Sequence, residues 1–318
     1  MENVYPIILL AESQIPTSAW LIPSIITLIL YGLGQGFVKM FIDDAPAARF
    51  CLYFVMAKVI FNLSYFGIFH KVDPFDPAGR TFMLYVVLAY IFDGLGWILY
   101  FQSILYGPIT IVGTLSAAYP ALVILFAGIF LKEQLMTIQY IGVFLVIACC
   151  LGLSYSPSDP TDENAKKTSK RWIPYAFLAL LLWSTSQTIV KYAYSLPNAD
   201  DANMLVFNSI GGILTLGVYG VLYGLKGKHN FREIGKSFLP MGMMAAGDIG
   251  VILALGKGPA SIVSPLTGAY PVVTLAFASI VLKEHITKLQ WFCITILILG
   301  IVLCSADNSL VESVKAYF

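Results

Sequence analysis

The sequence predicts an all-α, polytopic membrane protein with ten transmembrane helices, arranged as two inverted five-helix repeats. Three observations lead to this fold class: the composition, a series of long apolar runs, and a phrase that occurs twice. Hydrophobic residues make up 58% of the chain and charged residues 12%, against roughly 45–50% and about 25% in soluble domains. Such a chain has too little polar surface to face water on all sides.

Apolar runs of close to twenty residues recur along the whole chain. This is the length that a helix needs to cross a hydrocarbon core about 30 Å thick. A membrane β-barrel would instead show alternating segments of about ten residues. The ten expected helices cover approximately Trp20 to Phe41, Ala47 to Phe69, Thr81 to Leu105, Pro108 to Leu131, Thr137 to Tyr155, Trp172 to Tyr194, Met204 to Gly224, Phe238 to Leu255, Pro259 to Leu282 and Leu289 to Ser305.

The doubled phrase divides these helices into two sets of five. AYPALVILFAGIFLKE begins at Ala118 and AYPVVTLAFASIVLKE begins at Ala269, 151 positions later. A second match, at an offset of 152, pairs Tyr31, Gln35, Val38 and Lys39 with Trp183, Gln187, Val190 and Lys191. Because five is odd, the second set must enter the membrane from the opposite side, which predicts an inverted repeat.

The expected organisation follows from this division. It comprises an N-terminal tail (1–17), the first repeat (18–155), a polar linker (156–171), the second repeat (172–305) and a C-terminal tail (306–318). The first tail has no basic leader and is a poor signal peptide. The linker, SPSDPTDENAKKTSKR, has the composition of a disordered segment.

Three shared features connect the repeats to a known family. Each repeat has a tight Gly-Pro before its fourth helix, an Ala-Tyr-Pro inside that helix and a closing Leu-Lys-Glu. With these features the chain resembles the EamA-like branch of the drug/metabolite transporter superfamily over about residues 18–305. The resemblance implies a secondary transporter whose central cavity is lined by helices one, three, four, six, eight and nine. It places helices five and ten at the periphery, and it does not fix the substrate, which in this family ranges over amino acids, sugars, purines, amines and drugs.

Two prolines interrupt the fourth and ninth helices. Pro120 and Pro271 each lack an N–H and so free the carbonyl four residues earlier, on Ser116 and Thr267. A break at membrane depth is tolerated where it is buried in protein or lines a wet cavity, which makes these two residues, with Tyr119 and Tyr270, candidates for a binding site. The alternative is a packing kink, since proline is common in membrane helices.

Three ionisable residues fall near the middle of expected helices. A charge there costs about 2.5 to 3.5 kcal/mol, so Asp93 should face an interior cavity, have a partner or stay protonated. Asp248, on the eighth helix, corresponds to Asp93 if a gap of four residues is allowed, and its alternative role is a buried helix–helix hydrogen bond. Lys58 needs a charge partner, of which Asp93 or a phenol oxygen is the simplest; its alternative role is as a counter-charge for an anionic substrate group.

Amide and aromatic side chains complete the expected site. Gln35 and Gln187 can donate and accept hydrogen bonds, although an interhelical amide bond is an equal alternative. Aromatic walls beside buried acids suit a cation or an amino-group-bearing solute. The predicted substrate-binding residues are Gln35, Asp93, Trp97, Ser116, Tyr119, Trp183, Gln187, Asp248, Thr267 and Tyr270, with Lys58 as their charge partner. Gly32, Gly34 and Gly36 lie within a membrane helix, where they predict close helix packing and not a nucleotide loop.

The predicted function is secondary active transport of a small polar or amphipathic organic metabolite, such as an amino acid or an amine, by alternating access. A proton or a counter-substrate is the candidate coupling partner. The alternatives are a passive channel or a flippase for a lipid-linked substrate. No clustered nucleophile, His-carboxylate or metal set is found in the sequence, so no enzyme activity, cofactor or metal is expected.

The expected partners are the small-molecule substrate and the lipid bilayer. With 19 basic and 18 acidic residues, no nucleic-acid affinity is expected. The expected location is the plasma membrane, which in a bacterium is the inner membrane. The distribution of Lys and Arg places both termini outside the cytoplasm, whereas the resemblance implies the reverse, so the orientation stays open, as does the oligomeric state.

Overall fold

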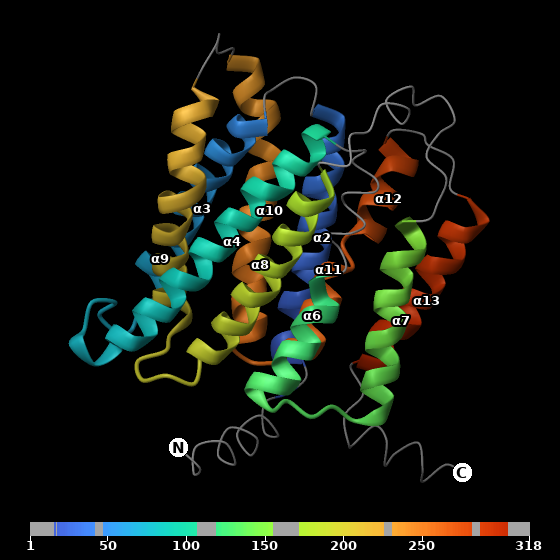
Figure 1. Ribbon diagram of the computed structural model, residues 1–318, viewed down its shortest axis with the longest axis horizontal. Helices are drawn as coiled ribbons and strands as arrows, with labels where there is room; N and C mark the ends of the chain where they lie inside the picture. Colours follow the sequence, from blue (N-terminus) through green and yellow to red (C-terminus); the bar gives the residue numbers. More distant parts are fainter. Residues whose placement is uncertain are drawn as a thin grey trace.

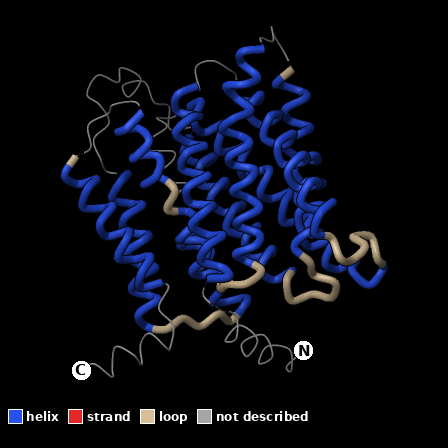
Figure 2. Tube along the Cα trace, turned by 180° about the vertical axis from the view of Figure 1, so that it is seen from behind, coloured by secondary structure: helices blue, strands red, loops and turns tan. Residues whose placement is uncertain are grey.

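The computed structural model is helical throughout the part of the chain that it describes, namely residues 16, 18–41, 47–106, 119–154, 172–225, 231–281 and 287–304. Figure 2 shows helices joined by short loops, with no strand among these residues. The expected linker and both tails, apart from residue 16, lie outside the described residues, as does Ser116.

The helices follow the predicted order (Figure 1). The first half contains α2 (Ser18–Phe41), α3 (Ala47–Phe69), the single-turn η2 (Pro77–Gly79), α4 (Arg80–Tyr106), α6 (Tyr119–Phe126), the π-helical η3 (Ala127–Leu131) and α7 (Thr137–Ser154). The second half contains α8 (Trp172–Ala193), α9 (Asp201–Gly212), the π-helical η5 (Ile213–Gly217) and η6 (Gly220–Gly224), α10 (Phe231–Leu255), α11 (Ala260–Gly268), α12 (Pro271–Val281) and α13 (Lys288–Cys304).

Seven helices of the described part are long and apolar enough to cross a membrane. Three shorter apolar helices accompany them: Tyr119–Leu131, Thr137–Cys149 and Trp291–Cys304. Large apolar side chains such as Ile68, Phe144 and Ile280 are 68–78% exposed on the outer surface. Soluble monomers rarely expose wide apolar patches, so this surface fits a lipid environment and the chain is a multi-pass membrane protein.

Helices of one half pack mainly on helices of the other half. The helix α2 packs along α10, and α8 packs along α4, so the first helix of each half lies against the third helix of the other. The short α6 lies between α8 and α11, and α7 packs against α13 at one edge of the bundle (Figure 1). The two halves are therefore interleaved and do not form separate bodies.

Three glycines let α2 approach its neighbours, as the sequence predicts. A Cβ atom added to Gly32 would lie 2.3 Å from the Cβ atom of Val273, and one added to Gly36 would lie 2.5 Å from the ring of Phe277. A Cβ atom on Gly34 would lie 2.8 Å from Met244. These contacts are shorter than carbon atoms tolerate, so close helix packing explains the glycines.

The predicted break in the ninth helix is present. The helix α11 ends at Gly268 and α12 begins at Pro271, which leaves Ala269 and Tyr270 outside the regular helix. The hydroxyl of Thr274 then donates to the carbonyl of Gly32 at 3.0 Å and fixes α12 to α2. The break expected at Pro120 in the fourth helix stays a prediction, because residues 107–118 lie outside the described part.

The contact between α7 and α13 leads to a stability prediction. A Cβ atom on Gly142 would lie 2.7 Å from the backbone nitrogen of Cys304, whereas one on Gly67 in α3 would meet nothing within 4 Å. Because backbone atoms cannot turn aside, Gly142→Ala should lower stability by about 1–3 kcal/mol. Gly67→Ala should cause no loss, since alanine favours a helix over glycine by about 0.8–1 kcal/mol.

Thermal unfolding of both variants in the same detergent checks this prediction. An equal loss in the two variants, or a neutral Gly142→Ala, would contradict the close α7–α13 contact.

Candidate functional site

A narrow cavity lies where six helices from both halves meet. Its free volume is about 40 Å³, which suffices for a few waters and is well below the roughly 300–1,000 Å³ of pockets that hold small organic ligands. The wall is formed by Tyr31 and Gln35 of α2, Asp93 and Trp97 of α4, Tyr119 of α6, Trp183 and Gln187 of α8, Met244 of α10, and Tyr270 between α11 and α12. These are the first, third, fourth, sixth, eighth and ninth helices that the family resemblance implies.

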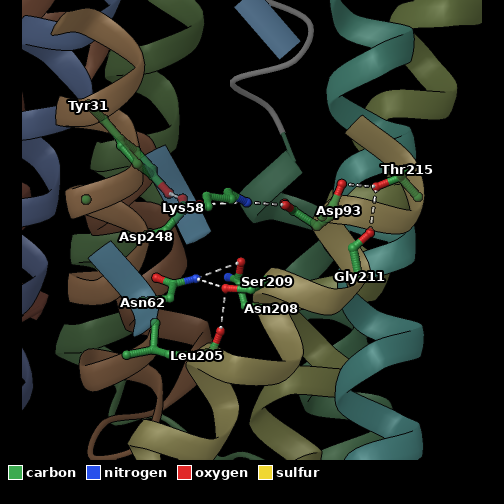
Figure 3. Close-up of polar contacts among 12 residues, drawn as sticks. Tyr31, Lys58, Asn62, Asp93, Leu205, Asn208, Ser209, Gly211, Thr215 and Asp248 are labelled. Carbon is green, nitrogen blue, oxygen red and sulfur yellow. Dashed lines mark hydrogen bonds and ion pairs between the residues drawn. The ribbon is translucent and has the colours of Figure 1, made fainter. Parts of the chain in front are cut away.

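A buried ion cluster lies beside the cavity (Figure 3). The ammonium group of Lys58 on α3 lies 3.1 Å from Oδ2 of Asp93 and 2.7 Å from Oδ2 of Asp248. The hydroxyl of Tyr31 donates a hydrogen bond to the other carboxylate oxygen of Asp248. The ion pair with Asp93 is the one that the sequence predicts for Lys58, and Asp248 adds a second.

Of the charged groups in the cluster, the carboxylate of Asp93 lines the cavity and the ammonium group of Lys58 does not. The side chain of Lys58 is 1% exposed, lies between the two carboxylates and is not part of the cavity wall. Its ammonium group also lies 4.6 Å from the centre of the Phe54 ring. The side chain of Asp93 is 21% exposed and forms part of the cavity wall. When both carboxylates are ionised, one lysine between them leaves a net negative charge, and the cavity then attracts cations more than anions.

Aromatic rings form much of the remaining wall. The rings of Trp97 and Trp183 lie 4.9 Å apart at 64°, and the ring of Tyr119 lies 6.0 Å from that of Trp183. Tyr31 and Tyr270 make an edge-to-face pair at 6.0 Å. The cavity therefore combines one partly exposed carboxylate with the faces and edges of several rings.

The two predicted glutamines differ in their hydrogen bonds. The amide nitrogen of Gln187 donates to the hydroxyl of Tyr119 at 3.3 Å, and its amide oxygen accepts from the hydroxyl of Ser264. The amide nitrogen of Gln35 lies 3.9 Å from the sulfur of Met244, which is a weak acceptor. Gln187 thus connects α6, α8 and α11, while Gln35 keeps more of its hydrogen-bonding capacity for a solute.

A second polar layer lies one helical turn from Lys58 along α3. The amide nitrogen of Asn62 donates to Oδ1 of Asn208 at 3.3 Å and to Oγ of Ser209 at 3.1 Å (Figure 3). All three side chains are buried. They fix α3 against α9 and so hold Lys58 in place.

Seven of the ten predicted site residues form the cavity wall. Asp248 is not part of the wall, and its carboxylate contacts the wall residue Tyr31 and the ammonium group of Lys58. Thr267 is fully buried and donates to the carbonyl of Val263 in its own helix at 2.9 Å, so the structure does not place it in the wall. Ser116 lies outside the described residues.

Two wall residues, Tyr31 and Met244, were not among the predicted site residues. Tyr31 is the repeat counterpart of Trp183, which was predicted. The repeat alone could therefore have pointed to Tyr31.

The packing of two glycines favours an ungapped alignment over the expected gapped correspondence of Asp248 with Asp93. Gly96 leaves room for the ring of Trp183, at 2.8 Å from its Cβ position, and Gly247 does the same for Tyr31, at 2.6 Å. Gly247 is therefore the counterpart of Gly96 at the ungapped offset of 151. Counting on from these glycines gives the counterpart pairs Trp97 with Asp248 and Asp93 with Met244.

Comparison with known proteins agrees with this architecture. The model of the EamA-like transporter family matches residues 14–155 and 170–306. The chain belongs to the EamA-like transporter family. This family is part of the drug/metabolite transporter superfamily of membrane transporters, so the predicted family and the multi-pass membrane class are confirmed.

Two further similarities add fold and sequence context. A solved crystal structure of a protein superposes with a TM-score of 0.67 at 14% identity, covering 91% of this chain and 96% of the other, which shows a shared fold. Uncharacterized protein MJ1333.1 of Methanocaldococcus jannaschii is 39% identical over 66 residues, which is 21% of this chain. The chain spans about half the length, 48%, of that curated relative.

The ion cluster leads to a prediction about coupling. Lys58→Met leaves two buried carboxylates without their cation and should cost about 3–5 kcal/mol of stability. The double variant Lys58→Met/Asp93→Asn should lose less than the sum of the two single variants, because the second change removes one of the unpaired charges. Unfolding midpoints of the four proteins in one detergent measure this coupling, and strictly additive losses would contradict it.

Proposed function

We propose that this protein is a secondary active transporter that carries a small polar or amphipathic organic metabolite with a positively charged group, such as an amine or an amino acid. The observation that carries the proposal is the cavity itself. Six helices of both halves converge on it, and its wall holds the partly exposed carboxylate of Asp93 among aromatic rings.

The charge arrangement supports a cationic group on the substrate. A bound ammonium group beside Asp93 would meet a cluster of net negative charge, and the faces of Trp97 and Trp183 would add cation–π attraction or cover an apolar body. Gln35 could bind a polar group of the same molecule. An anionic group would need Lys58, which is buried and already paired with the two carboxylates.

The packing of α7 on α13 supports two inverted repeats. At the offset of 151, Gly142 corresponds to Cys293 and Cys149 corresponds to Gly300. Gly142 lies against Gly300, and Cys149 lies against Cys293. The two helices therefore run antiparallel. Counterpart helices that run antiparallel are what an inverted repeat requires.

Alternating access fits this arrangement. The seven long and three shorter apolar helices would make the ten spans, and the exchange of partners between α2–α10 and α8–α4 fits a two-fold axis in the membrane plane. Halves related in this way can exchange two unequal conformations and so open the cavity to either side in turn. A proton or a counter-substrate would drive the cycle, in the plasma membrane or the bacterial inner membrane.

A ligand screen tests the substrate class. The purified protein is heated with amines, amino acids, sugars and organic acids, and the stabilised unfolding midpoint identifies the ligand. A solute at 100 times its Kd should stabilise the protein by about 2.7 kcal/mol. Cationic solutes should give the shifts, Asp93→Asn should abolish them, and Asp73→Asn, which changes an exposed loop acid, should leave them intact. Stabilisation by acids alone, or shifts that survive Asp93→Asn, would contradict the proposed site.

Transport assays with the stabilising solute test the mechanism. Proteoliposomes should show saturable uptake and exchange of internal for external solute, both reduced at least about tenfold by Asp93→Asn. Flux that does not saturate would indicate a channel instead. Uptake that is equal with and without a pH gradient would exclude a proton as the coupling partner.

A further inference from the structure

Glu133 makes three hydrogen bonds between the two halves of the chain. Its Oε1 atom accepts from the backbone N–H of Ala260 at 2.9 Å. Its Oε2 atom accepts from the N–H of Ser261 at 2.9 Å and from the hydroxyl of the same serine at 2.6 Å. A residue just beyond the fourth helix thus caps the first turn of α11, which belongs to the other half.

The backbone at the end of η3 and at the start of α11 favours this contact. Lys132 has the left-handed conformation (φ 57°, ψ 28°), and its N–H bonds to the carbonyl of Ala127, which ends η3 and turns the chain toward α11. The helix α11 follows Pro259, which offers no side-chain cap. The first N–H groups of a helix have no partner within it, and a carboxylate suits them because of both its charge and its acceptor capacity.

Two helices connect the Glu133 contact with the cavity wall. The helix α6 begins at Tyr119 in the cavity wall and leads through η3 to Glu133, while α11 begins at Ala260 and leads back to the wall at Tyr270. The two helices also touch at the cavity, where a Cβ atom on Gly268 would lie 2.8 Å from the ring of Pro120. The helix α11 begins at one end of the bundle, next to Glu133. We call this the Glu133 end.

Other contacts close the same end. The ammonium group of Lys191 on α8 donates to the carbonyl of Gly258 at 2.9 Å, just before α11. The helices α6–η3 and α11 touch at Glu133 and at Pro120. Between these two contacts, the side chains of Val123 and Ala127 are fully buried. The helices α6, α8 and α11 are therefore closely packed between the cavity and the Glu133 end.

We infer that Glu133 is a conformational latch of the transport cycle, an inference that rests on the proposed alternating-access function. Its carboxylate joins the fourth helix of one half to the ninth helix of the other and holds the Glu133 end closed. Opening that end separates these helices and breaks the three hydrogen bonds. Because the bonds exist in only one of the two conformations, removing them shifts the population toward the other conformation.

A cysteine reporter in the cavity tests the latch without any substrate. Gln35→Cys places a thiol in the cavity wall, and a membrane-impermeant maleimide is applied to either side of sealed vesicles. Parent protein without Gln35→Cys corrects for the native cysteines. A separate Ser195→Cys protein identifies the membrane side of the Glu133 end, since Ser195 is exposed just beyond α8.

The test variant is Glu133→Gln. Its amide has a single acceptor atom and presents its NH2 group to one of the two N–H groups of α11. Labelling of Gln35→Cys from the Glu133 end should rise about tenfold, and labelling from the opposite side should fall, as a population shift requires. Ser261→Ala, which removes one of the three bonds, should give a smaller rise in the same direction.

Two matched controls separate the latch from a general effect of charge. Lys132→Gln changes the neighbouring exposed residue, and Glu284→Gln makes the same substitution in the Lys-Glu pair of the second repeat. Neither should raise labelling from the Glu133 end. An equal rise with either control would overturn the latch.

The remaining outcomes distinguish the latch from the function on which it rests. Unchanged labelling in Glu133→Gln, or a rise from both sides together with a lower unfolding midpoint, would overturn the latch alone and leave Glu133 as a structural cap. Equal labelling from both sides with Glu133 intact would overturn alternating access itself, and the latch with it.

Discussion

The pairing of Lys58 with Asp93 and Asp248 is the constraint on which the rest of the site depends. A lone charge at the centre of a membrane costs about 2.5 to 3.5 kcal/mol even on the more lenient scales, so each carboxylate requires the lysine nearby, and the lysine requires a carboxylate. The requirement brings α3, α4 and α10 to one point, and the hydrogen bond from Tyr31 adds α2. The cluster thereby fixes which faces of four helices turn inward, and it determines the sign of charge in the cavity wall.

The repeat predicts a symmetric backbone, but the residues around the cavity are chemically asymmetric. Tyr31 and Trp183 are counterparts, and each covers a glycine on the facing helix, yet the residue after that glycine is Asp248 in one case and Trp97 in the other. The same backbone contact thus carries a carboxylate on one side and an indole on the other. Helices that correspond in the repeat therefore carry different chemistry around the cavity.

The sequence predicted the helices and their pairing more completely than the orientation of single side chains. Long apolar runs and the two repeat offsets were sufficient for the helix order, because hydrophobic length and internal similarity are direct consequences of the bilayer and of duplication. They were insufficient for Thr267, which turns into the bundle, and for the register of Asp248, because lipid-facing and protein-facing positions are both apolar and leave little periodicity to read. Helix rotation is set instead by close contacts such as those of Gly96 and Gly247, which become visible only when the helices are packed. The role of Ser116 stays a prediction.

The broken ninth helix connects the cavity to the Glu133 end. Its first segment, α11, is held at its start by Glu133 and near its end by Pro120, while its second segment, α12, is fixed to α2 through Thr274. Between them, Ala269 and Tyr270 belong to neither helix. The N–H of Ala269 bonds to the carbonyl of Leu266, and the carbonyl of Tyr270 accepts from the N–H of Thr274 at the start of α12. A helix interrupted in this way can tilt one segment while the other stays packed, because no continuous ladder of hydrogen bonds has to be distorted. Since Tyr270 also forms part of the cavity wall, a tilt of α11 that released Glu133 would move the wall at the same time. In the proposed alternating-access cycle, the break would therefore couple the shape of the cavity to the closure of one end, which is the coupling that a carrier needs and a static pore does not.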